Sequence, residues 1–344
     1  MKVLEVPTAS RPRSTGRIRS LDSLRGLCLM LMTADHAMGP IGLPWATMGF
    51  VLIAGITAGV VFERTAERGG TQALFRRCWT RAVQIFLANV TIATVLAVAA
   101  IALALVGRGS MTSVQWALAA QRYVESISLF NGFPYAGLLS MYVSLIFGAP
   151  FLILILRSVG WPPVLLSGAA IWCLGEATRP EPAWTYNILC WQLPFVWGLA
   201  GGYLHMARRW VPRLPIGVPI VAAISLMTIV ALRWTWVGFS FPRKPFSQLD
   251  FLWIVELALL VTAIQPLAVW YEGRRPQMIS SWVERLGRHS LAVFVWAWPI
   301  THWLSRLGDH GVQVGWAGKI LFGIVAVASL QIPVGFDEMK SRRS

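Results

Sequence analysis

Four ionisable side chains stand in an otherwise apolar segment near the start of the chain, RIRSLDSLRGLCLMLMTADHAMGP at 17–40: Asp22, Arg25, Asp35 and His36. On an α-helix, Arg25 and His36, eleven residues apart, are separated by about three full turns and about 16 Å along the axis, so they share one face. Asp22 is three residues before Arg25 and joins that face, whereas Asp35 points about a quarter turn away from His36. One helix therefore presents a carboxylate, a cation and an imidazole in a row.

These residue types suit a group-transfer reaction. A neutral imidazole in a polar cleft is the usual general base for a hydroxyl group, and a guanidinium binds phosphate or carboxylate through its planar fork of donors. With Arg25 near the cytoplasmic end and His36 toward the outer side, the helix would hold an anionic donor at one level and an acceptor hydroxyl at the other. The alternative is structural: Asp22 and Arg25 pair at the membrane interface, His36 reaches the outer surface, and Asp35 only orients the helix.

The composition places this segment in a membrane. The chain has 344 residues, of which 56% are hydrophobic and only 13% charged, whereas a soluble domain carries about 25% charged residues. Ionisable groups at membrane depth are costly and are functional candidates by default. A span needs roughly 20 apolar residues, and ten stretches meet or approach this length: 21–40, 45–62, 80–106, 135–156, 162–177, 186–205, 214–235, 248–271, 286–305 and 316–335. The sequence therefore predicts an all-α, polytopic bundle of about ten transmembrane helices, embedded in the lipid bilayer.

The distribution of positive charge predicts the orientation of this bundle. With a cytoplasmic N-terminus, 21 of the 30 Lys and Arg residues fall in cytoplasmic segments and 6 in outer loops, as the positive-inside rule requires. The net charge of +15 thus reflects topology and not nucleic-acid binding. We expect a basic cytoplasmic tail (1–20), one transmembrane domain (21–335) whose first span is retained, and a second cytoplasmic tail (336–344). The longest segment outside the membrane, 107–134, could include a short surface helix.

Other chemical signatures are absent from the sequence. The four cysteines, Cys28, Cys78, Cys173 and Cys190, lie far apart without a CxxC pair or metal-ligand spacing, which argues against a disulfide scaffold or a zinc site. We expect no metal and no tightly bound cofactor. The stretch GITAG at 55–59 predicts close helix packing.

Six segments resemble, in order, those of the OpgC-type membrane acyltransferases. The first resembles the family's R-x-x-x-LD-x-x-RGL…DH opening. The others are FVLIAGITAGVVF (50–62), RCWTRAVQIFLANV (77–90), LLSMYVSLIFGAPFLIL (138–154), NILCWQLPFVWGLAGG (187–202) and LGRHSLAVF (286–294). The chain departs from the family pattern at Ala54, where Ser is common, at Ile56, where an aromatic is common, and at His289, which replaces Asn. The likeness covers about residues 17–305.

The resemblance implies a multi-pass enzyme of the bacterial plasma membrane, within the larger type-three membrane acyltransferase group. The donor would be a cytoplasmic acyl-CoA, used as a co-substrate, and the acceptor a hydroxyl of an extracytoplasmic glycan such as a periplasmic glucan, with succinyl or acetyl as the acyl group. His36 and Arg25 match the motif histidine and arginine, and Asp22 and Asp35 match its acidic positions. Relatives of heparan-α-glucosaminide N-acetyltransferase share the LD-x-x-RGL opening, but the DH and WQ pairs favour the OpgC type.

Further residues are candidates for binding the two substrates. Donor binding could involve Asp22 and Arg25 together with Arg81, Arg288 and Ser290. Like Arg81, Arg77 could either bind the donor or only mark topology. Acceptor binding could involve Tyr142, Trp191, Gln192 and His302, of which His302 is also a second candidate for catalysis. The alternatives are that the arginines only mark topology and that the polar and aromatic residues only pack helices or line the membrane interface. The sequence does not predict a role for Glu176 or Glu256.

A transporter or flippase is the main rival class, because it would use the same buried charges to move a substrate unaltered. Transporters often contain inverted repeats with broken helices in matching halves, and the sequence shows no such symmetry. A non-catalytic assembly factor would leave the polar face of the first span without a function. A homo-oligomer is compatible with every reading. We therefore interpret the protein as a membrane O-acyltransferase.

Overall fold

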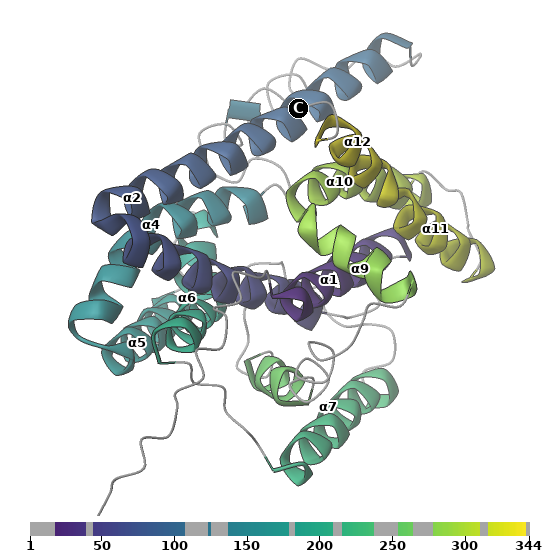
Figure 1. Ribbon diagram of the computed structural model, residues 1–344. Helices are drawn as coiled ribbons and strands as arrows, with labels where there is room; N and C mark the ends of the chain where they lie inside the picture. The colour runs from purple at the N-terminus through teal and green to yellow at the C-terminus, as the bar shows by residue number, and fades with distance from the viewer. Residues whose placement is uncertain are drawn as a thin grey trace, which may run out of the picture.

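The computed structural model describes residues 18–38, 44–106, 123–124, 137–178, 183–208, 215–236, 254–263, 278–309 and 316–341, and within them every long regular element is an α-helix (Figure 1). The helices are α1 (Arg19–Met38), α2 (Pro44–Val106), α4 (Gly137–Ser158), α5 (Trp161–Thr178), α6 (Ala183–Arg208), α7 (Gly217–Trp236), α9 (Met278–Arg288), α10 (Ser290–Asp309), α11 (Trp316–Ser329) and α12 (Gln331–Ser341). The all-helical fold class is confirmed.

Three helical stretches in the described residues are long and apolar enough to cross a membrane: Ala46–Val95, Leu138–Ser158 and Gly318–Phe336. Two shorter apolar helices cover Gly217–Ile229 and Ile254–Ala263. The full set of ten spans and the cytoplasmic location of both termini stay predictions. The tail at 1–17 and most of the outer segment 107–134 lie outside the described residues.

Several predicted spans differ from the helices at their ends. The spans at 45–62 and 80–106 lie on one element, α2, which bends sharply at Gly70 so that its two arms diverge in Figure 1. Gly70 has φ 69° and ψ −170°, a conformation that is essentially restricted to glycine. The span predicted at 286–305 begins inside α9, and its helix starts afresh at Ser290. The last predicted span is divided between α11 and α12.

Helix α1 lies at the centre of the bundle. It packs against α2, α9, α10 and α11, and Figure 1 shows α9 to α12 on one side of it and α2, α4, α5 and α6 on the other. The closest approach is to α9, because Gly26 lies against the backbone of Val283 and Gly287 lies against that of Asp22. Glycines at this crossing allow the polar helix to be buried by its neighbours.

Helices α2 and α6 also meet through glycines. Gly55 and Gly59 of α2 contact the α6 backbone, and Gly198 and Gly202 of α6 contact the α2 backbone. Small residues four apart on both helices bring two backbones together, which is how helices associate closely without large side chains between them. The packing predicted from GITAG is confirmed.

We expect Gly202→Ala to lower the free energy of unfolding by about 1–3 kcal/mol, the usual cost of overpacking a core. The added methyl group would meet the backbone of Ile56, which cannot move aside alone. Its neighbour Gly201 has open space around it, so Gly201→Ala should leave stability unchanged or raise it by about 0.5–1 kcal/mol, because alanine favours the helix. Unfolding of the purified protein in detergent measures both. Equal stabilities of the two variants would contradict this packing model.

Candidate active site

The polar face predicted from the first span lies on one unbroken helix. Helix α1 runs from Arg19 to Met38 without interruption, so Arg25 and His36 keep the eleven-residue spacing that places them on the same face. Asp22 is buried, whereas Arg25, Asp35 and His36 are half-buried. The side chains therefore face the interior of the bundle.

Arg25 reaches across to α2. Its Nη2 donates a hydrogen bond of 2.8 Å to Thr57 Oγ1, and the Thr57 hydroxyl donates to the Ile53 carbonyl oxygen at 2.8 Å. The Thr57 proton is thus used by the backbone, and its lone pair is turned toward the guanidinium. This arrangement holds the Arg25 side chain against the first arm of α2.

Tyr142 of α4 converges on the same point. Its hydroxyl is close enough to the Arg25 guanidinium and the Cys28 thiol to interact with both electrostatically. Its ring meets Phe50 edge-on with centroids 5.8 Å apart, and Phe50 stacks on Phe294 of α10 at 6.3 Å. The structure therefore brings together Arg25, predicted on the donor side, and Tyr142, predicted on the acceptor side.

His36 lies in the last turn of α1, at the other end of the polar face. Its imidazole interacts electrostatically with the neighbouring Asp35 carboxylate. The side chain of His302, the second predicted catalytic candidate, lies outside the part of α10 that the structure describes.

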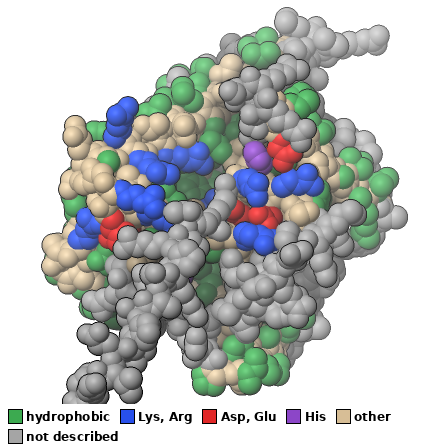
Figure 2. Space-filling view, in the orientation of Figure 1, with side chains coloured by type: hydrophobic (Ala, Val, Ile, Leu, Met, Phe, Trp, Pro, Cys, Tyr) green, Lys and Arg blue, Asp and Glu red, His purple; other side chains and the backbone are tan. Residues whose placement is uncertain are grey.

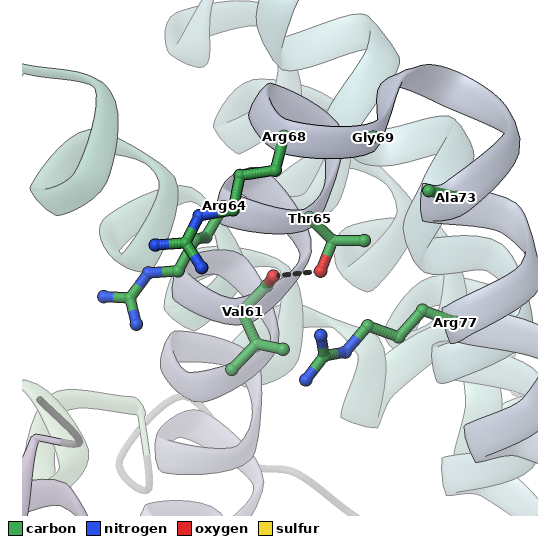
Figure 3. A pocket seen from close by; sticks show the side chains of 7 residues that line it. All are labelled: Val61, Arg64, Thr65, Arg68, Gly69, Ala73 and Arg77. Carbon is green, nitrogen blue, oxygen red and sulfur yellow. Dashed lines mark hydrogen bonds between the residues drawn. The ribbon is translucent and has the colours of Figure 1, made fainter. Parts of the chain in front are cut away.

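A basic pocket lies at the bend of α2. It has a volume of about 300 Å³ and is lined by Val61, Arg64, Thr65, Arg68, Gly69, Ala73 and Arg77. Figure 3 shows the guanidinium groups of Arg64 and Arg68 extending side by side from the first arm, while Arg77 points from the second arm toward the first. Three guanidinium groups around one hollow make a site suited to phosphate groups.

The wall of this pocket is held in place by neighbouring helices. Arg157 at the end of α4 donates to both carboxylate oxygens of the buried Glu63, through two hydrogen bonds of 2.9 Å. Arg64 Nη2 lies 3.8 Å from Met206 Sδ of α6. The first arm of α2 is therefore tied to α4 and α6 next to the arginines.

Basic side chains occupy two groups on one face of the molecule. Figure 2 shows one group over α2 and a second over α1 and α9, with an apolar hollow between them. At the contact between α1 and α9, Arg19 and Arg288 bind the buried Glu284 at 3.1 Å and 2.9 Å. A polyanion would meet positive charge on either side of this hollow.

A family model described as OpgC protein matches residues 17–341, nearly the whole chain. The chain belongs to the OpgC family. No curated protein and no solved structure matches the sequence. Together with the apolar helices, membership in the OpgC family indicates a membrane protein and an OpgC-like acyltransferase that acts on glucans.

Two of the predicted acceptor residues of this OpgC-family protein have packing contacts. Gln192 Nε2 donates to the carbonyl oxygens of Gly168 on α5 and Leu189 on α6, at 2.7 Å and 3.2 Å. Trp191 is 1% exposed and lies in the hydrophobic core. These contacts match the packing alternative for both residues, and their role in acceptor binding stays a prediction.

Some of the predicted donor residues of this OpgC-family protein lie near one another, because Asp22 lies against Gly287, the residue before Arg288. Arg288 bonds Glu284 within α9, and Ser290 is buried at the start of α10. Arg81 donates to Gln84 on its own helix at 3.1 Å and does not line the basic pocket, whereas Arg77 does. Donor binding by Asp22, Arg81, Arg288 and Ser290 stays a prediction.

Arg64 and Arg68 were not predicted as site residues and counted only as markers of topology. A local signal for them exists. They are four residues apart, which places them on one face of a helix, and the Gly69–Gly70 pair that follows allows the chain to bend back. This spacing before a glycine pair, followed by Arg77, indicates that the three side chains gather around the bend.

Proposed function

We propose that this OpgC-family protein is an O-acyltransferase of the bacterial plasma membrane. It would move a succinyl or acetyl group from cytoplasmic acyl-CoA to a hydroxyl of an extracytoplasmic glucan. One observation carries the proposal: α1, enclosed by four other helices, holds Arg25 and His36 on one face, about 16 Å apart along the axis. A thioester that enters from the Arg25 side can meet an acceptor hydroxyl near His36 within the bundle.

The proposed reaction is direct acyl transfer with His36 as the general base. His36 removes the proton of the acceptor hydroxyl while its oxygen attacks the thioester carbonyl carbon. The tetrahedral intermediate collapses, the C–S bond breaks, and the thiol of coenzyme A leaves with the proton that His36 had accepted. The Asp35 carboxylate next to His36 stabilises the transient imidazolium through its negative charge.

The basic pocket at the bend of α2 is proposed to bind the phosphate groups of the donor. Coenzyme A carries several phosphates, and bidentate guanidinium–phosphate contacts are strong because both partners are charged. Arg64, Arg68 and Arg77 supply three such groups around one hollow. On the predicted topology this bend is cytoplasmic, the side from which the donor comes.

We expect Arg77→Gln to raise the KM for acyl-CoA about 10-fold or more, because a hydrogen bond to a charged group contributes about 1.5–3 kcal/mol. Arg76 provides a matched control, since it is exposed, adjacent in sequence and not part of the pocket lining. Arg76→Gln should leave the KM nearly unchanged. Initial rates at varied acyl-CoA measure both. Equal effects of the two variants would mean that only the overall positive charge of this face matters.

The proposed function is tested by mass spectrometry of glucans from cells with the wild-type protein, without the protein, and with His36→Ala. Loss of one acyl mass from a glucan in both the deletion and the variant supports acyl transfer, and the mass identifies the acyl group. Mild alkali removes an ester but not an amide, so a mass that survives alkali would indicate N-acetyl transfer instead. Unchanged modification with a changed amount of exported glucan would indicate a transporter.

A further inference from the structure

The hydroxyl group of Tyr142 is buried in the core, and its hydrogen-bonding capacity is not met by the part of the chain that the structure describes. Tyr142 is 5% exposed, and its Oη has no hydrogen-bond partner among the described residues. Buried polar atoms in proteins almost always have a partner, because leaving one unpaired costs the free energy of its desolvation. The unpaired hydroxyl points to a ligand that supplies the missing acceptor.

The surroundings of the hydroxyl define what that ligand is. On one side are the Arg25 guanidinium and the Cys28 thiol, and on the other the Tyr142 ring is flanked by Phe50, which stacks on Phe294. A sugar would bring several hydroxyls into these apolar walls, where each one would need its own partner. A thioester on an apolar arm brings a single carbonyl acceptor. This arrangement therefore fits the donor better than the acceptor.

We propose that the Tyr142 hydroxyl donates a hydrogen bond to the carbonyl oxygen of the acyl thioester. This inference rests on the proposed function and deepens it, because it names the group that binds the reacting carbonyl. When the acceptor oxygen attacks the carbonyl carbon, the C=O electron pair moves onto this oxygen. The Tyr142 O–H stabilises the resulting oxyanion, and for His36 to act on the attacking oxygen the reacting carbonyl must lie on the His36 side of this hydroxyl. The electron pair then returns to re-form the C=O bond as the C–S bond breaks and the thiol leaves with the proton held by the base.

Tyr142→Phe tests the proposal, because it removes only the hydroxyl and keeps the ring that packs on Phe50. We expect kcat to fall about 10- to 100-fold, with the KM for acyl-CoA within about 3-fold of wild type, since the hydroxyl stabilises charge that develops in the transition state. Unfolding should occur at the same or a higher temperature, because an unpaired buried hydroxyl has been removed. Tyr203→Phe on α6, a half-buried tyrosine outside this cluster, should keep full activity.

A second measurement observes the hydrogen bond directly. With the thioester carbonyl labelled with ¹³C and no acceptor present, the infrared carbonyl band of bound acyl-CoA should lie at lower frequency in wild type than in Tyr142→Phe. Full activity of Tyr142→Phe, or an identical carbonyl band, would overturn the role of Tyr142 while wild-type transfer continues. Absence of acyl transfer by the wild-type protein itself would instead overturn the proposed function.

Discussion

His36→Ala is expected to lower acyl transfer about 10²- to 10⁴-fold, the usual contribution of a positioned general base. An acceptor hydroxyl is a poor nucleophile until its proton is removed, and alanine cannot accept it. The side chain is half-buried in the last turn of α1, so its removal should not prevent insertion of the helix. The rate of transfer to glucan by purified protein, together with its amount in the membrane, measures the two effects separately.

Two variants serve as controls for this substitution. His36→Gln keeps a polar side chain of similar reach but cannot act as a base, so it should be as inactive as His36→Ala. His205→Ala removes a half-buried histidine on α6 that belongs to neither the polar face of α1 nor the pocket at the α2 bend, and it should retain wild-type activity. Retained transfer by His36→Ala would place the base elsewhere, with His302 as the next candidate.

The polar face of α1 could be predicted from the sequence because it depends on one helix only. The spacing of Asp22, Arg25 and His36 fixes their common face through helix geometry alone, and the structure keeps α1 continuous over all three. The same holds for GITAG, whose spacing already brings Gly55 and Gly59 onto one face. Which residues share a face of one helix can be predicted from their spacing, because this does not depend on the helices that pack against it.

Contacts between helices could not be predicted from residue spacing. Tyr142 interacts with Arg25 and Cys28 from a helix far away in the chain, and this proximity could not be predicted from the residue pattern. Its predicted role in acceptor binding stays a prediction. Gln192 and Arg288 each allowed both a functional and a structural interpretation from residue type. Only the bonds to Gly168 and to Glu284 show what each side chain contacts.

The basic pocket at the bend of α2 depends on the backbone conformation of a single residue, Gly70. The left-handed conformation of Gly70 turns the second arm back toward the first, and this turn brings Arg77 to the pocket that Arg64 and Arg68 line. When the spans at 45–62 and 80–106 are considered separately, the arginines between them indicate only positive charge near a membrane surface. The pocket follows from the angle between the arms, which the residue pattern does not encode.

Arg25→Ala is expected to lower kcat/KM for acyl-CoA about 10- to 100-fold, because hydrogen bonds to a charged group contribute about 1.5–3 kcal/mol. Arg25 is held by Thr57 Oγ1 at 2.8 Å and lies beside the Tyr142 hydroxyl. Its loss removes positive charge from the path of the donor. Arg25→Lys keeps the charge but not the planar fork, so it should restore protein levels and only part of the activity. Steady-state rates at varied acyl-CoA, with membrane levels from quantitative blotting, measure these effects.

Arg19→Ala separates this role from a purely structural one. Arg19 lies on the same helix and binds Glu284 of α9 at 3.1 Å, so its removal should weaken the α1–α9 contact and lower stability without changing the kcat/KM of the protein that remains folded. Arg25→Ala should show the reverse pattern, with a large loss in kcat/KM and a small loss in stability. If Arg25→Ala instead disappears from the membrane, and the little that remains has wild-type kcat/KM, Arg25 acts as a helix anchor through Thr57. In that case the donor would be held by the arginines of the α2 bend alone.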